Sequence, residues 1–108
     1  MPQFKIRYVS EDALMSVGGR LLDRLAAAVG CDRSWLKLEL EPTRRFGDAG
    51  PEPSEPYVEV HWFDRPEEVR RQVAAILAEE LRGDAEYVAV EFAVIPPDGY
   101  YENGRRFD

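Results

Sequence analysis

The chain has little of the residues that build disulfides and metal sites: Cys31 is its single cysteine and His61 its single histidine. One cysteine excludes a disulfide within the chain, which fits a reducing compartment. A lone histidine, with no second His or Cys at ligand spacing, argues against a metal centre. We therefore expect a cytoplasmic protein that uses no metal and no cofactor.

Long apolar runs and basic clusters are also missing. No apolar run approaches the roughly 20 residues that cross a bilayer, and polar side chains interrupt residues 1–7 at every second position, unlike a signal peptide. Lys and Arg number 14 against 21 Asp and Glu, which gives a formal net charge of -7. Because binding to phosphates needs a concentrated basic surface, we expect neither nucleic acid nor a membrane as partner.

Apolar residues are plentiful, at 44% of 108 residues, with 32% charged. A chain of this length has room for one domain with its own core, so we predict a single domain over residues 1–108. Alternating polar and apolar side chains predict strands at 3–8, 36–41, 57–62 and 88–94. Between them, helical periodicity predicts one helix from Ser10, an N-cap, to Gly30, and another from Asp64, in a capping box with Glu67, to Gly83.

The two halves superimpose at a shift of 54 positions without a gap, with Pro2 on Pro56 and Pro42 on Pro96. This indicates a duplicated β-α-β unit, residues 2–42 and 56–96, followed by a C-terminal arm, residues 97–108. A crossover helix makes the strands of each unit parallel. We predict an α/β two-layer sandwich: a four-stranded mixed sheet with two helices on one face. Its other face is polar and mixed in charge, either open to water or packed in an assembly.

Two segments outside the repeats carry candidate functional residues. Residues 43–55 read as a long loop that contains Arg44-Arg45-Phe46-Gly47, and long loops in small domains are often functional. Asn103-Gly104 predicts a tight hairpin in the arm. The arm is rich in aromatic residues for a chain end, so we expect it to dock on other protein surface, such as a neighbouring subunit.

Several of these features together resemble the tautomerase superfamily, which includes 4-oxalocrotonate tautomerase and macrophage migration inhibitory factor. They are the Met1-Pro2 start, two complete β-α-β halves, the Phe46-Gly47 loop and the aromatic tail with its Asn-Gly. The segments 60–65 and 100–104 are most similar to an uncharacterised bacterial branch. The resemblance covers essentially the whole chain. It implies a homotrimer with inward-facing sheets, active sites at subunit boundaries, and a small keto or enol acid as substrate.

The resemblance also implies that Pro2 is a general base once Met1 is removed. A free α-amino group titrates at roughly pKa 8, and burial or a nearby cation lowers that value, which leaves a neutral base. The alternative is that Pro2 only starts a strand. Pro56 can only be structural because its nitrogen is an amide.

Further site residues follow from the same resemblance. Lys37 stands where 4-oxalocrotonate tautomerase has an arginine, which keeps the charge but loses the bidentate fork. It could equally pair with a glutamate on the sheet face. The other candidate substrate contacts are Arg44, Arg45, Phe46, Glu91, Tyr101 and Asn103. Of these, the resemblance carries Phe46, as the aromatic that shields the pocket, whereas Arg44 and Arg45 are alternative anion binders. Arg44 and Arg45 could instead be solvated, and Phe46 could simply pack its loop.

Two positions depart from the migration inhibitory factor pattern. Cys31 replaces a lysine after Gly30, and Glu91 replaces an asparagine donor. A carboxylate at position 91 repels an enolate unless it is protonated, or serves as a second acid-base group.

The sequence leaves three hypotheses for the function: a small tautomerase, a non-catalytic trimeric binding or structural protein of the same fold, and a monomeric ferredoxin-like sensing domain.

Overall fold

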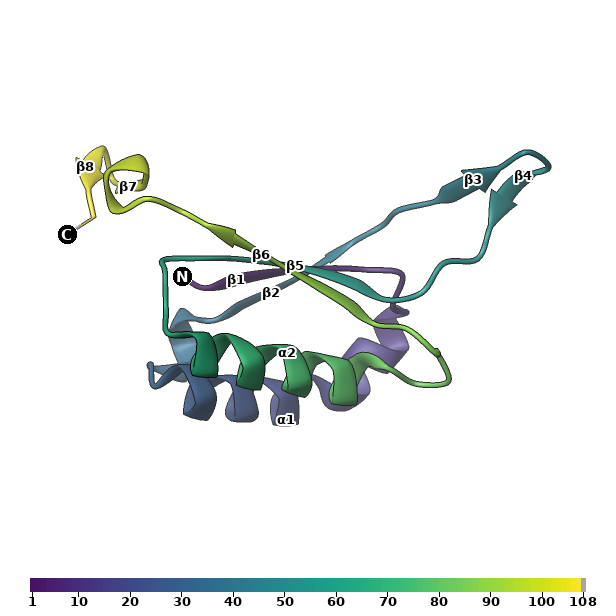
Figure 1. Ribbon diagram of the computed structural model, residues 1–108, viewed down its shortest axis with the longest axis horizontal. Coiled ribbons are helices and arrows are strands. Elements are labelled where there is room, and N and C mark those ends of the chain that lie inside the picture. Colours follow the sequence, from purple (N-terminus) through teal and green to yellow (C-terminus); the bar gives the residue numbers. More distant parts are fainter. Residues whose placement is uncertain (108) are drawn as a thin grey trace.

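Four strands form one sheet in the computed structural model, which describes residues 1–107. They are β1 (Gln3–Arg7), β2 (Lys37–Glu41), β5 (Tyr57–Trp62) and β6 (Ala89–Val94), in the order β2-β1-β5-β6. The pairs β1–β2 and β5–β6 are parallel, whereas β1 and β5 are antiparallel. Both helices cover the same face of this sheet (Figure 1). The predicted fold class is confirmed.

The first helix, α1 (Glu11–Val29), begins and ends where the sequence predicts. The Ser10 hydroxyl accepts a hydrogen bond from the amide of Ala13 at 3.0 Å, which satisfies one of the unpaired donors of the first turn. Gly30 closes the helix in the left-handed conformation, with φ 74°. Glycine adopts this conformation without the steric cost of a Cβ.

The second helix, α2 (Glu67–Leu81), ends before Gly83 as predicted, but its predicted start is wrong. Pro66 is the N-cap residue, and no side chain caps the helix. The amide of Arg70 donates to the Pro66 carbonyl at 3.2 Å, so the first helical hydrogen bond starts at Pro66. Asp64 lies two positions too early to reach the free amides of the first turn, and the predicted capping box does not form.

The core lies between the sheet and the two helices. Alternate residues of β1 and β5 point into it, and α1 and α2 each supply a stripe at helical spacing. Its fully buried side chains include Phe4, Ile6, Leu21, Leu25, Val58, Val60, Trp62, Val73 and Leu77.

The strand register corrects the gap-free superposition of the two halves. Gln3 pairs with Lys37, 34 positions later, whereas Tyr57 pairs with Ala89, 32 positions later. The second crossover is therefore two residues shorter, and α2 has 15 residues against 19 in α1. A change of two residues leaves the alternation of side chains intact, so the sequence pattern cannot reveal it. Lys37 corresponds in space to Ala89 rather than to Glu91.

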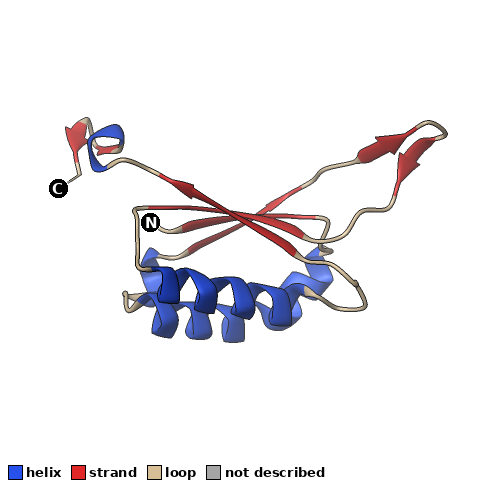
Figure 2. Cartoon of the chain, viewed as in Figure 1, coloured by secondary structure: helices blue, strands red, loops and turns tan. Residues whose placement is uncertain are grey.

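Two small hairpins project from opposite ends of the sheet (Figures 1 and 2). The segment predicted as a long loop carries the first, β3 (Arg45–Gly47) with β4 (Gly50–Glu52). The second joins β7 (Tyr101–Glu102) to β8 (Arg105–Arg106), after a short 3₁₀ turn at Pro97–Gly99. Asn103 and Gly104 both have positive φ, at 52° and 77°, as a two-residue type I′ turn requires. The predicted Asn-Gly hairpin is confirmed.

The sheet face opposite the helices is polar, and several of its charged side chains are paired within the face. Arg7 bridges Glu41 at 2.8 Å and Glu59 at 3.2 Å, and His61 contacts Glu59 at 3.1 Å. The hydrogen bond with His61, followed by the charge of Arg7, lowers the pKa of Glu59. This face is therefore a compensated network rather than a surface of one sign.

Candidate functional site

A cleft of about 480 Å³ is lined by residues from the N-terminal end of the chain and from the C-terminal hairpin. Figure 1 shows that the chain start and this hairpin lie toward the same end of the sheet. It lies beside the start of β1, at the foot of the C-terminal hairpin. A volume of this order suits a small-molecule ligand. Its lining residues are Met1, Gln3, Ser34, Trp35, Lys37, Phe63, Arg65, Tyr100, Glu102 and Phe107.

Pro2 stands between two residues that line this cleft, Met1 and Gln3, and its own ring is fully buried. Its carbonyl accepts a hydrogen bond from the amide of Lys37 at 3.3 Å, which fixes the start of β1 against β2. Met1 lines the cleft, and its ammonium group donates to the carbonyl of Trp35 at 3.4 Å. Removal of Met1 would therefore leave the Pro2 nitrogen as a secondary amine beside the cleft.

Two cations line the same cleft, Lys37 from β2 and Arg65 from the connection between β5 and α2. Lys37 Nζ donates to the Ser34 carbonyl at 3.2 Å. Arg65 Nη1 donates to the Phe63 carbonyl at 3.1 Å, and its guanidinium lies 5.2 Å from the ring centre of Trp62. These contacts hold the Arg65 side chain in place, since a guanidinium over an indole face is attracted by the ring.

Arg65 was not among the residues predicted for the site, although the pairing of the two repeats indicates its position. Because β1 and β5 are antiparallel, the start of β1 pairs with the end of β5, where Gln3 faces His61. A residue that follows β5 therefore lies near Pro2. The antiparallel pairing of the two repeats would have pointed to this connection.

Three aromatic rings form one wall of the cleft. Phe63 and Phe107 stack with ring centres 5.4 Å apart and planes 6° from parallel, and Tyr100 packs edge-on against both. The amide of Phe107 donates to the Tyr100 carbonyl at 3.0 Å. The C-terminal arm thus docks on Phe63 of its own chain.

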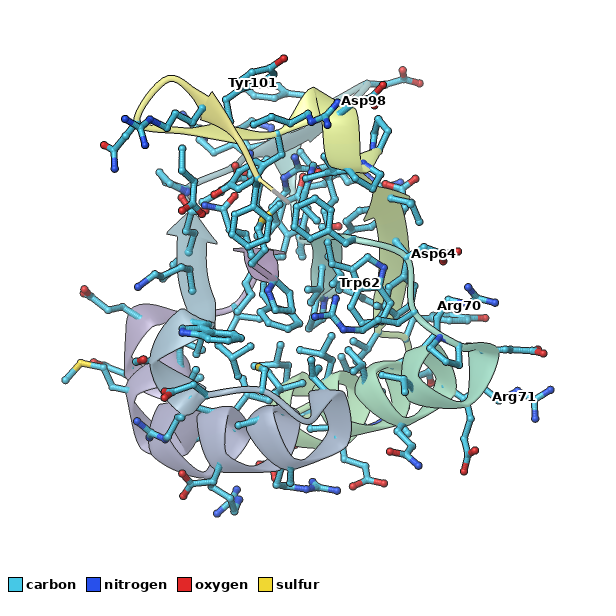
Figure 3. The ribbon with its side chains drawn as sticks, turned by 90° about the vertical axis from the view of Figure 1, so that its left-hand side faces the viewer. Trp62, Asp64, Arg70, Arg71, Asp98 and Tyr101 are labelled. Atoms are coloured by element: carbon cyan, nitrogen blue, oxygen red, sulfur yellow. The ribbon has the colours of Figure 1, made fainter. Side chains whose placement is uncertain are left out.

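Two of the predicted contacts from the arm do not line this cleft. Side chains two apart share a side of an extended segment, so Tyr100 and Glu102 face the cleft together. Tyr101 is 59% exposed, and Figure 3 shows it at the outer edge of the hairpin. Asn103 lies in the exposed turn. Within one chain, Tyr100 and Glu102 rather than the predicted Tyr101 and Asn103 line the cleft.

The predicted loop residues Arg44, Arg45 and Phe46 lie at the opposite end of the sheet from the cleft (Figure 1). Arg45 bridges Glu52 at 3.3 Å, and the Arg44 guanidinium lies 5.5 Å from the ring centre of Phe46. Phe46 is 64% exposed. One chain does not bring these residues together with Pro2.

Glu91 lies on the polar face of β6 rather than in the cleft. It accepts a hydrogen bond from the Tyr57 hydroxyl at 3.0 Å, and this bond raises the pKa of Tyr57.

Within residues 1–107, no group of three or more His, Cys, Asp and Glu side chains is arranged to hold a metal ion. None of the helices in the described part of the chain is long and apolar enough to span a bilayer.

Residues 1–106 match the family described as a domain of unknown function, DUF1904. The chain belongs to this family. A DUF1904 structure from Sebaldella termitidis ATCC 33386 is similar at a TM-score of 0.90 and 28% identity, over 99% of this chain and 100% of that one. A protein of unknown function from Vibrio cholerae O1 biovar eltor strain N16961 is similar at 0.85 and 28%, over 98% and 87%.

The fold is also that of the tautomerases. A structure described as native fused 4-OT is similar at a TM-score of 0.78 and 17% identity, over 97% of this chain and 95% of that one. Two other fused 4-OT structures are described as an asymmetric and a symmetric trimer. No curated protein matches the chain. These findings confirm the predicted resemblance: a DUF1904 protein with the tautomerase and migration inhibitory factor fold.

Proposed function

We propose that this DUF1904 protein is a keto-enol tautomerase that acts on a small α-keto or enol acid. The observation that carries the proposal is a cleft lined by the two chain neighbours of the buried Pro2, Met1 and Gln3, and by two cations, Lys37 and Arg65. A base beside a small cleft that holds cations is what proton transfer next to a carboxylate requires.

Pro2 is the base in this proposal. With Met1 removed, its nitrogen is a secondary amine, and the nearby cations disfavour its protonated form. The neutral amine takes a proton from the carbon next to the keto group, and the resulting ammonium returns a proton in the reverse direction. Lys37 and Arg65 bind the substrate carboxylate and so orient the reacting carbon toward Pro2.

The active assembly in this proposal is a homotrimer. Arg44, Arg45 and Phe46 lie too far along the sheet to reach their own cleft, so they can contribute only to the cleft of a neighbouring copy. The trimers described for fused 4-OT support this arrangement. Light scattering should give the mass of three chains, and a monomer would contradict the shared site.

The test combines intact mass with an assay. We expect the purified protein to lack Met1 and to accelerate the ketonisation of phenylenolpyruvate or 2-hydroxymuconate, followed by ultraviolet absorbance. A chain that retains Met1 has an amide at Pro2 and contradicts the proposed base. A trimer without Met1 that accelerates neither reaction would instead favour a non-catalytic binding protein of the same fold.

A further inference from the structure

The C-terminal hairpin brings a second titratable pair into the cleft. Tyr100 and Glu102 both line it, together with Gln3 of β1 and Lys37 of β2. Glu102 is the one carboxylate among the lining residues in the part of the chain that the structure describes. Burial raises the pKa of Tyr100, and the nearby Glu102 carboxylate raises it further. The tyrosine therefore stays protonated and can donate to the carboxylate.

Tautomerisation moves protons at two atoms, a carbon and an oxygen. Pro2 directly precedes β1, whose Gln3 lines the cleft, whereas Glu102 reaches the cleft from β7 of the C-terminal hairpin. Two groups on different sides of a bound substrate can serve the two atoms without moving the substrate. The cations then remain free to hold the substrate carboxylate.

We propose that Glu102 is a second catalytic residue, which exchanges the proton of the substrate oxygen while Pro2 exchanges that of the carbon. This inference rests on the proposed function. In ketonisation, the Glu102 carboxylate removes the enol O–H proton, and the oxygen electrons form the carbonyl. Pro2, neutral at rest, first takes a proton from solvent, and the electrons of the carbon–carbon double bond then take that proton to form the new C–H bond. Glu102 releases its proton to solvent, which restores the neutral amine and the carboxylate.

Tyr100 is a positioning residue in this scheme. Its ring is fixed against Phe63 and Phe107, and its hydroxyl is close enough to Glu102 for the carboxylate to raise the pKa of Tyr100. In the proposed scheme this hydroxyl orients the Glu102 carboxylate. Because Tyr100 does not exchange the substrate proton, its loss should lower the rate without removing the ionisation of Glu102 from the pH profile.

The test is steady-state ketonisation of phenylenolpyruvate across pH by the full-length protein. We expect Glu102→Gln to lower kcat by roughly 10²-fold with KM changed less than about threefold, and to lose the acid limb of the kcat profile. Glu102→Asp should recover part of the rate. Tyr100→Phe should lose about tenfold and keep the acid limb. Glu86→Gln, in the connection before β6, is the matched control and should leave kcat unchanged.

The outcomes separate this inference from the function on which it rests. If Glu102→Gln keeps the wild-type kcat and pH profile while Pro2→Ala is inactive, the role of Glu102 is overturned and the tautomerase proposal stands. If the wild-type protein does not accelerate the reaction, both are overturned. Equal losses in Glu102→Gln and Glu102→Asp, without any change in the pH profile, would also contradict proton transfer by Glu102.

Discussion

The two leading prolines of the duplicated fold occupy equivalent places. Pro2 and Pro56 are both buried just before a central strand. The carbonyl of Pro2 accepts the amide of Lys37 at 3.3 Å, and that of Pro56 accepts the amide of Ala89 at 3.1 Å. Each proline thus aligns its strand with the parallel neighbour in the same way. The backbone contacts of the two prolines are the same, so the duplication by itself does not explain a catalytic role for Pro2.

The side chains around the two prolines differ. Where Lys37 brings a cation to the cleft beside Pro2, the corresponding Ala89 brings a methyl group beside Pro56. The residue before Pro2 is Met1, which can be removed, whereas Glu55 binds Pro56 into the chain. In the proposed function, catalysis depends on the residues that differ between the two halves.

The largest effect should come from the prolines themselves. We expect Pro2→Ala to lower kcat/KM for enol acid ketonisation by roughly 10³-fold, because a primary amine replaces the buried secondary amine. Pro56→Ala should keep kcat/KM within about threefold and destabilise the fold by about 1 kcal/mol, because the unfolded chain gains freedom. The assay and chemical denaturation of both variants measure this contrast. Equal losses of activity would contradict it.

The matched pair of strand positions gives the next effect. Lys37→Ala should lower kcat/KM about 10²-fold, mainly through KM, because the substrate carboxylate loses a charge-assisted partner. Lys37→Arg should keep most of the wild-type kcat/KM, because it keeps the positive charge. Ala89→Lys adds a cation beside Pro56 and should add no activity, since an amide nitrogen is not a base. A rise in turnover for Ala89→Lys would show that the cation alone makes the site.

An ion pair between the helices joins the two halves. Glu80 of α2 contacts Arg20 and Arg24 of α1 at 2.6 and 2.8 Å, and its side chain is only 6% exposed. Hydrogen bonds from the two arginines lower the pKa of Glu80 from 4.5 to about 2.

The charged form of Glu80 is therefore favoured by folding. Its contribution is fully present above pH 4.5 and is lost as the pH falls through about 2. Glu80→Gln should cost about 2–3 kcal/mol of unfolding free energy at pH 7 and less toward pH 2. The exposed pair Glu67–Arg71, at 3.2 Å, is the control, and Glu67→Gln should cost at most about 0.5 kcal/mol. A Glu80 effect that does not change with pH would contradict the ionic origin.

The helix starts give the smallest effect. Ser10→Ala removes the side-chain cap of α1 and should cost about 1 kcal/mol. Asp64→Ala should cost less than about 0.5 kcal/mol, because Asp64 does not cap α2. Thermal melts of the two variants under the same conditions test the difference. Equal losses of unfolding free energy in the two variants would show that Asp64 does cap α2.

The sequence could predict what depends on local pattern. Alternation located the four strands, and the turn chemistry of Gly30 and Asn103-Gly104 located a helix end and a hairpin. Features that depend on crossover length and on strand pairing could not be predicted from local pattern. The two-residue shortening before Ala89 preserves alternation. Which alternating side chains of the arm line the cleft depends on how the arm folds back. Arg65 shares the cleft with Lys37 only through the antiparallel pairing of β1 with β5.

The central claim is that Pro2 is a free, neutral amine beside the cleft. Nitrogen NMR of the protein labelled with ¹⁵N-proline, followed across pH, observes that nitrogen directly. We predict one titrating proline amine whose midpoint lies below the range of an ordinary α-amino group, roughly 7.7–8.0. A spectrum in which every proline nitrogen is an amide, or a midpoint within or above that range, would contradict the claim.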